Sequence, residues 1–241
     1  MDDTPRDAGE TFSTTPSEVG PQPSASLVLI DRSGTEPKVL LGRRNLSLVF
    51  LPGKYAFPGG RLEADDHKMP AVGALAERCV ARLGLRRPEA SPPAQAFALA
   101  AIREMFEETG LLIGAPPTTP PESLPHAWRL FAEQGFAPDL APLRFFARAV
   151  TPPQFPRRFD TSFFLVDASA IAHELGGHVG PDKELIEIGW FSLKQARTRD
   201  ISRITAMILS EVEATFDRDF IQDFSVPFFH AEQQRWIREE L

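Results

Sequence analysis

The sequence has almost no cysteine, no long apolar run and no excess of positive charge. Cys79 is the only cysteine among 241 residues, which excludes an internal disulfide and a zinc site built from several cysteines. We expect Cys79 to be a small buried apolar residue. No apolar run approaches the roughly 18 residues that span a bilayer, and the acidic N-terminus lacks the apolar stretch of a signal peptide. The sequence therefore predicts a cytoplasmic protein that makes no membrane contact.

The formal net charge of −7 argues against a nucleic-acid partner, because phosphate backbones select basic surfaces. Hydrophobic residues make up 42% of the chain and charged residues 24%, which is typical of a globular protein with a substantial core. An acidic protein that handles phosphates needs cations in its site. A small anionic substrate would therefore have to be bound together with metal ions.

The chain is predicted to form one domain over residues 25–241, behind a disordered tail over residues 1–24 that is rich in Pro, Ser, Thr and acidic residues. Two β-prone runs, 25–30 and 39–41, flank a turn-like segment and predict a hairpin or adjacent strands. Further strands are predicted at 51–60, 143–150, 161–166 and 185–192, and helices at 72–83, 94–109, 122–134 and 201–216. This mixture indicates an α+β or layered α/β domain.

The helix predicted over residues 94–109 has the clearest boundaries and carries a carboxylate face. Ser91, Pro92 and Pro93 favour a helix start, and Gly110 is placed to end it. Helical spacing puts three glutamates on one face and apolar side chains almost opposite. The glutamates are Glu104, Glu107 and Glu108, and the apolar residues are Leu99, Ile102 and Phe106. One side of this helix can therefore pack while the other presents carboxylates.

Two interpretations of the carboxylate face remain open. Like charges at these spacings weaken a helix by a few tenths of a kcal/mol per pair, so a cation should be present to offset the repulsion. Mg²⁺ and Mn²⁺ take carboxylate oxygens and also bind phosphate, so the face could hold a diphosphate. The alternative is an ordinary solvated acidic face on a scaffold protein, which predicts that Mg²⁺ has no effect on the melting temperature.

The context of this helix resembles the Nudix box, whose pattern is Gly, five residues, Glu, seven residues, then Arg-Glu-apolar-X-Glu-Glu-X-Gly-apolar. Gly60 and the segment REMFEETGL, which starts at Arg103, match the pattern's fixed positions. Asp66 stands where the pattern has Glu, and residues 67–102 stand where it has seven residues. The resemblance implies a Nudix-type α/β/α sandwich with a mixed central sheet and an inserted helix, at about residues 67–95, within the box.

The interrupted box and the segment RRFDTSFF, residues 157–164, are similar to the Nudix subgroup that contains the peroxisomal coenzyme A diphosphatases. This resemblance implies a metal-dependent pyrophosphohydrolase that cleaves the diphosphate of a small-molecule nucleoside diphosphate derivative, with coenzyme A or acyl-coenzyme A as the preferred substrate. A catalytically inactive Nudix-like module that senses ADP-ribose or a related nucleotide is the alternative. Homodimers are common in the family, and we hypothesise that the insertion forms part of a substrate lid.

The resemblance also implies roles for individual residues. The Mg²⁺ or Mn²⁺ ligands would be Glu104, Glu107, Glu108 and the carbonyl of Gly59, with Arg103 orienting the carboxylates by ion pairing. Glu104 would also accept the proton of the attacking water, with Glu184 or Glu187 as the alternative base. Arg43, Arg44, Arg157 and Arg158 would contact anionic groups of the substrate, unless they are solvated surface arginines.

Overall fold

The structure, a computed structural model, describes residues 20–117, 124–215, 225–232 and 235–241. Most of the predicted tail lies outside these residues. The first strand, β1, spans Gln22–Asp31 and therefore begins three residues before the predicted start of the domain. Those three residues are fixed by a parallel pairing with β8, which starts at Gln22 opposite Phe159.

The centre of the molecule is a mixed sheet, nine-stranded over the described residues, in the order β10-β2-β1-β8-β7-β11-β12. Two short strands extend it, β3 beside β2 and β4 beside β1. The strands are β2 (Lys38–Arg44), β3 (Tyr55–Ala56), β4 (Gly59–Arg61), β7 (Arg144–Val150), β8 (Phe159–Asp167), β10 (Leu185–Ser192), β11 (Pro227–Glu232) and β12 (Arg235–Glu240). The β1/β8 and β7/β11 pairs are parallel and the others are antiparallel. The predicted hairpin of β1 and β2 is confirmed.

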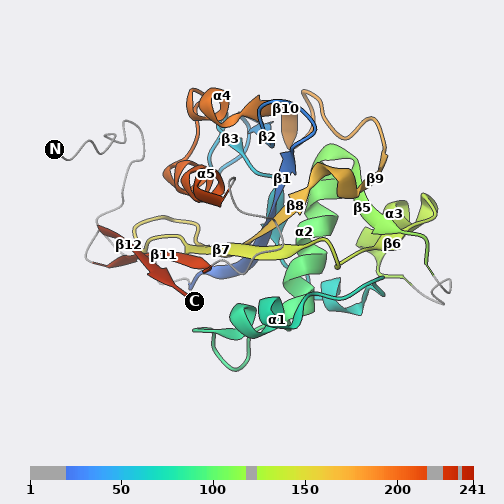
Figure 1. The fold of residues 1–241 in the computed structure, drawn as a ribbon, viewed down its shortest axis with the longest axis horizontal. Coiled ribbons are helices and arrows are strands. Elements are labelled where there is room, and N and C mark those ends of the chain that lie inside the picture. Colours follow the sequence, from blue (N-terminus) through green and yellow to red (C-terminus); the bar gives the residue numbers. More distant parts are fainter. Residues whose placement is uncertain (1–19, 118–123, 216–224, 233–234) are drawn as a thin grey trace.

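Helices cover both faces of this sheet (Figure 1). Alternate residues of β1 divide between the two layers: Leu27 and Leu29 pack with α2 (Ala94–Thr109), whereas Val28 and Ile30 pack with the layer that contains α5 (Arg203–Thr215). This is the alternation expected of a strand buried on both faces. The short helix α4 (Leu193–Arg197) also lies on the α5 side. The predicted α/β/α sandwich is confirmed.

A smaller sheet beside α2 was not predicted from the sequence. It contains β5 (Leu111–Ala115), β6 (Ala137–Pro138) and β9 (Ile171–Glu174) in the order β6-β5-β9. The predicted helix at 122–134 is realised as the 3-10 turn η2 (His126–Trp128) followed by α3 (Arg129–Glu133). Its first two residues lie outside the described residues. Another 3-10 turn, η3 (Ala168–Ala170), joins β8 to β9.

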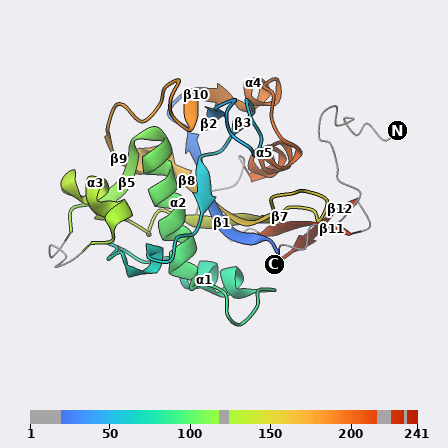
Figure 2. The same cartoon turned by 180° about the vertical axis from the view of Figure 1, so that it is seen from behind.

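The insertion within the box begins with the 3-10 turn η1 (Asp66–Lys68) and contains α1 (Glu77–Gly84), beside α2 (Figure 2). The helix predicted from residue 72 is therefore five residues too long at its start. Val72 instead pairs its backbone with Pro138 and Leu140, with N···O distances of 2.8 and 3.0 Å. Backbone pairing of this kind removes a residue from a helix despite its helical apolar spacing.

Two buried arginines attach the end of the insertion to the central sheet. Arg87 donates to Asp160 at 2.9 Å and to Ser162 at 2.8 Å, and its guanidinium lies 4.2 Å from the ring centroid of Phe97. Arg148 donates to both oxygens of Asp160, at 2.7 and 2.8 Å. The buried carboxylate of Asp160 thus accepts hydrogen bonds from two guanidinium groups. The insertion is joined to the sheet at this point as well as through the chain on either side of it.

Candidate functional site

Helix α2 positions the carboxylates because its apolar residues are almost fully buried against the sheet. The helix ends at Gly110, whose φ of 78° is the left-handed conformation that glycine adopts at low cost. A Cβ at Gly110 would lie 1.9 Å from the carbonyl oxygen of Leu175. The predicted boundaries of this helix, residues 94–109, are confirmed.

The glycine pair before the insertion lets strand β4 approach the carboxylates closely. The backbone N–H of Gly59 donates to Glu108 Oε2 at 3.0 Å. A Cβ at Gly60 would lie 2.5 Å from the Glu104 carboxyl group, so any side chain at this position would have to displace that carboxyl group. Glu104 and Glu108 therefore lie close to the backbone of β4, in an arrangement that depends on the missing side chain of Gly60.

Arg103 is buried and connects the two halves of the box. Its guanidinium donates to both oxygens of Asp66, at 2.8 and 3.2 Å, and to the carbonyl of Arg61 at 2.9 Å. It also donates to Glu104 at 2.8 Å and to Glu107 at 3.0 Å. The shorter Asp66 thus reaches the arginine across the insertion. This fixed fork holds the carboxylate face in place.

Burial sets the charge state of the carboxylates. Desolvation raises the pKa of Glu104 to about 7, although the neighbouring Arg103 acts in the opposite direction. Burial also raises the pKa of Glu108 well above its usual range, with a further contribution from Glu104. The pKa of Glu107 is raised by burial as well. On Arg103, burial alone would lower the pKa, but the surrounding carboxylates outweigh it and keep the guanidinium charged.

The donor set fits a hard divalent cation. Glu108 Oε1 is buried and has no hydrogen-bond partner, and the carboxyl groups of Glu104 and Glu108 have raised pKa values that a nearby cation would lower. Glu107 is directed to Arg103 and is half-exposed. Over the residues that the structure describes, no three His, Cys, Asp or Glu side chains already lie together as a metal-ligand group. Glu104 and Glu108 are thus the best-placed protein ligands.

The remaining predicted residues of β2 and β10 lie on two different faces of the sheet. Arg44 lies on the α2 side, where it forms an ion pair with Glu184 at 3.2 Å. The charge of Glu184 raises the pKa of both Glu104 and Glu108, so Glu184 belongs to the site. Arg43 is paired across the sheet with Glu187. The side chains of both face the other layer.

Arg43 and Glu187 are therefore poor candidates for the roles predicted from sequence. The Tyr55 hydroxyl donates to the Glu187 carboxylate, and Tyr55 is part of the core on the α5 side. Arg43 donates to the carbonyl of Gly53 at 3.4 Å. Neither Arg43 nor Glu187 lines the cleft that contains Glu104. Arg43 points behind the sheet because it is adjacent to Arg44 on β2, and Glu187 points the same way because it is paired with Arg43.

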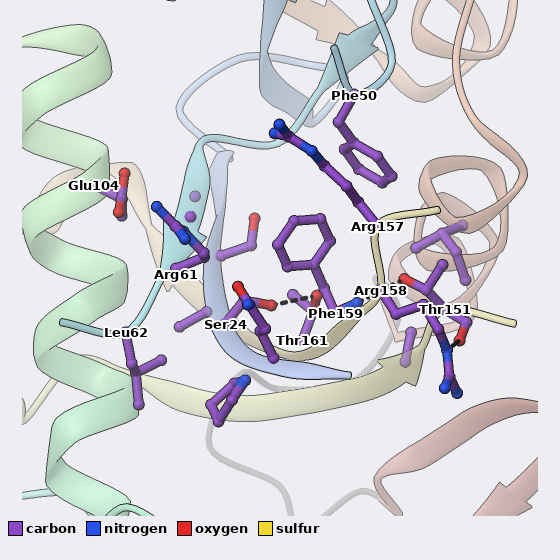
Figure 3. Close-up of a pocket in the computed structure, with 18 of the residues that line it drawn as sticks. Ser24, Phe50, Arg61, Leu62, Glu104, Thr151, Arg157, Arg158, Phe159 and Thr161 are labelled. Carbon is purple, nitrogen blue, oxygen red and sulfur yellow. Dashed lines mark hydrogen bonds between the residues drawn. The ribbon is translucent and has the colours of Figure 1, made fainter. Parts of the chain in front are cut away.

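A cleft of about 1580 Å³ runs from Glu104 along the N-terminal parts of β1 and β8. Arg61 and Arg157 extend into it from opposite sides, with Phe50 and Phe159 near Arg157 (Figure 3). Arg158 also lines the cleft but donates to the carbonyl of Thr151 at 3.1 Å. Sequence reasoning missed Arg61. Its position directly after the glycine pair was the signal that could have identified it.

The insertion contributes to the wall of the cleft through His67 and residues 90–93, and residues 62–65 just before it line the same wall. The anchor formed by Arg87 lies shortly before residues 90–93. The insertion therefore borders the cleft as the lid hypothesis requires. Movement of the insertion as a lid stays a prediction.

The chain is similar to known proteins in sequence and in fold. It is 29% identical to the human acyl-coenzyme A diphosphatase NUDT19 over 176 residues, which covers 53% of this chain and 47% of that protein. The chain thus spans about half the length of this curated relative. A crystal structure of a NUDIX hydrolase from Alicyclobacillus acidocaldarius superposes with a TM-score of 0.62 and 26% identity, covering 86% of this chain and 100% of the other. No family model matches the chain.

Proposed function

We infer that this chain, which belongs to the Nudix hydrolase superfamily, is a metal-dependent hydrolase of phosphoanhydride bonds. The observation that carries the proposal is the carboxylate pair of the largely buried Glu104 and the buried Glu108 against the glycines of β4, with one oxygen of Glu108 left without a partner. A scaffold with a solvated acidic face would have no reason to bury these groups, because burial of an unpaired carboxylate is costly.

Glu104, Glu108 and the carbonyl of Gly59 would hold Mg²⁺ or Mn²⁺, with Glu107 able to join them if it leaves Arg103. When bound, the metal would neutralise the diphosphate and make the attacking water more acidic. Arg103 keeps Glu104 oriented toward β4 through its fork of hydrogen bonds. These groups are the minimum that the proposed reaction needs at the phosphorus atom.

Glu104 is the preferred proton acceptor. Its carboxyl group lines the cleft next to Gly59 and Gly60, where a water made more acidic by the metal would be within reach of it. Glu184 is the alternative base, because it faces the same carboxylates and lines the cleft. Glu187 is disfavoured as the base, because it accepts a hydrogen bond from Tyr55 behind the sheet.

The proposed substrate is coenzyme A or an acyl-coenzyme A, in keeping with the name of the human relative. Arg44, Arg61, Arg157 and Arg158 supply positive charge along the cleft for the diphosphate and for a further phosphate of the nucleotide. The overall charge of −7 leaves a nucleic-acid partner disfavoured. None of the helices in the described ranges is long and apolar enough to cross a membrane. Homodimer formation stays a prediction.

The alternative is a nucleotide sensor that binds without hydrolysis. A sensor would have no need of an arginine fork that orients carboxylates toward a glycine gap, so the arrangement around Arg103 favours the enzyme. The two functions differ in one measurable property, which is turnover of the bound nucleotide in the presence of metal.

The test is a panel of coenzyme A, acetyl-coenzyme A, NADH, ADP-ribose and nucleoside triphosphates in Mg²⁺ or Mn²⁺, with products identified by mass. We expect coenzyme A to give 3′,5′-ADP and phosphopantetheine, and the Glu108→Gln variant to lose this activity. The exposed Glu77 on α1 offers a matched control, because Glu77→Gln removes a carboxylate outside the site. If a folded, metal-binding protein cleaves nothing on the panel, the sensor is the better assignment.

A further inference from the structure

The loop between β2 and β3, residues 45–54, exposes large apolar side chains beside the cleft. Leu46 and Val49 are 69% and 72% exposed, the highest values among the exposed large hydrophobic residues of the described ranges. A single exposed apolar residue is common on a protein surface. Two of them on one short loop, next to a binding cleft, form an apolar patch that indicates a binding role.

Hydrogen bonds hold this loop in its outward-facing conformation. The side-chain amide of Asn45 donates to the carbonyls of Pro181 and Lys183, each at 2.9 Å. Arg44, the last residue of β2, donates to the carbonyl of Phe50 at 3.0 Å. Leu51 has a φ of 50°, which is costly for a residue other than glycine. The exposure of Leu46 and Val49 is therefore maintained by the rest of the loop.

The patch is continuous with the cleft. Leu48, Val49, Phe50 and Leu51 all line it. The Phe50 ring packs edge-on against Phe159, with their centroids 5.0 Å apart. Phe50 and Phe159 lie near Arg157 (Figure 3). Along the cleft, carboxylates are thus followed by arginines and then by an apolar rim.

We propose that residues 46–50 bind the apolar acyl chain of an acyl-coenzyme A substrate whose diphosphate lies at Glu104 and Glu108. The inference rests on the proposed function. A small amphiphile is favoured as the ligand of the patch, because the neighbouring arginines extend into the cleft and would bind an anionic group on the same molecule. A lipid surface or a second copy of the chain would cover Leu46 and Val49 but would leave the cleft arginines without an anion.

The test compares coenzyme A with octanoyl-coenzyme A by isothermal titration calorimetry in Ca²⁺, a hard cation that carboxylates also bind, under conditions where mass analysis shows that neither ligand is cleaved. We expect octanoyl-coenzyme A to bind about tenfold more tightly, since part of its chain leaves water. Its heat capacity of binding should also be more negative. The Leu46→Ser, Val49→Ser double variant should lose this advantage. Val80→Ser should keep it, because Val80 is 45% exposed on α1 and lies outside the cleft lining.

Each outcome separates the inference from the proposed function, which is measured independently as cleavage of coenzyme A in Mg²⁺. Equal affinity of the two ligands for the unmodified chain would overturn the acyl site even if coenzyme A is cleaved. Retention of the octanoyl advantage in the double variant would overturn it as well. If the double variant keeps the octanoyl advantage but no longer binds phosphatidylcholine vesicles, the patch is assigned to a lipid surface instead. If it keeps the advantage but changes its oligomeric state, the patch is assigned to contact with a second copy of the chain.

Discussion

Raising the pH from 5 to 7.5 in the absence of divalent metal should destabilise the protein. Glu104 has a pKa of about 7 in the folded chain against 4.5 as the ordinary value. For a carboxyl group with a raised pKa, the folded state binds the proton more strongly than the unfolded state. Stability is therefore lost as the pH rises from the unfolded pKa through the folded one. Added Mg²⁺ or Mn²⁺ should restore it, because the cation offsets the negative charge.

The size of this loss of stability follows from the difference between the folded and unfolded pKa values. A shift from 4.5 to about 7 corresponds to about 3 kcal/mol for Glu104 alone at full ionisation. Glu107 and Glu108 act in the same direction, since burial raises both of their pKa values. The carboxyl groups with lowered pKa values, such as Asp31 and Asp167, change charge below this window. The fall in stability should therefore be visible above pH 5.

The assay is urea denaturation in EDTA at intervals from pH 5 to pH 7.5, for the unmodified chain and for Glu104→Gln. The variant cannot ionise at this position, so its free energy of unfolding should depend less on pH and should exceed that of the unmodified chain at pH 7.5. Parallel pH profiles for the two proteins would refute the assignment of a raised pKa to Glu104.

Three further predictions follow from the geometry. Gly60→Ala should lower kcat by at least about tenfold in a coenzyme A cleavage assay, because its Cβ would displace Glu104 from a 2.5 Å approach. Glu184→Gln should lower kcat/KM by about tenfold, whereas Glu187→Gln should change it less than about twofold, and the reverse order would contradict the face assignment. Asp160→Ala should lower the free energy of unfolding by about 3–5 kcal/mol in urea denaturation, because it leaves two buried arginines without their carboxylate.

The box helix and the central strands could be predicted from the sequence because local signals and tertiary structure agree there. Proline before Ala94 and glycine after Thr109 mark the ends of α2. Long apolar runs, such as that of β1, identify strands buried on both faces. The carboxylates on α2 needed only the helical period. The half of the site that lies on one helix was therefore within reach of sequence reasoning.

The peripheral strands could not be predicted in the same way. β5 and β9 are short, and each exists because it pairs with the other beside α2. The C-terminal strands β11 and β12 carry charged residues between the apolar ones and join the sheet through a parallel contact with β7. Such strands are determined by pairing with distant segments. Their propensities alone do not distinguish them from loops.

The choice between Glu184 and Glu187 shows where local patterns stop being sufficient. A regular strand alternates its faces, so Leu185 and Glu187 should share one face. In the structure Leu185 is opposite Arg44 and Glu187 is opposite the preceding residue, Arg43, because the register shifts between them. This irregularity turns Glu187 toward Tyr55 while Glu184 stays beside Arg44. Which glutamate reaches the site is thus fixed by a bulge, and a bulge depends on the partner strand rather than on the local sequence.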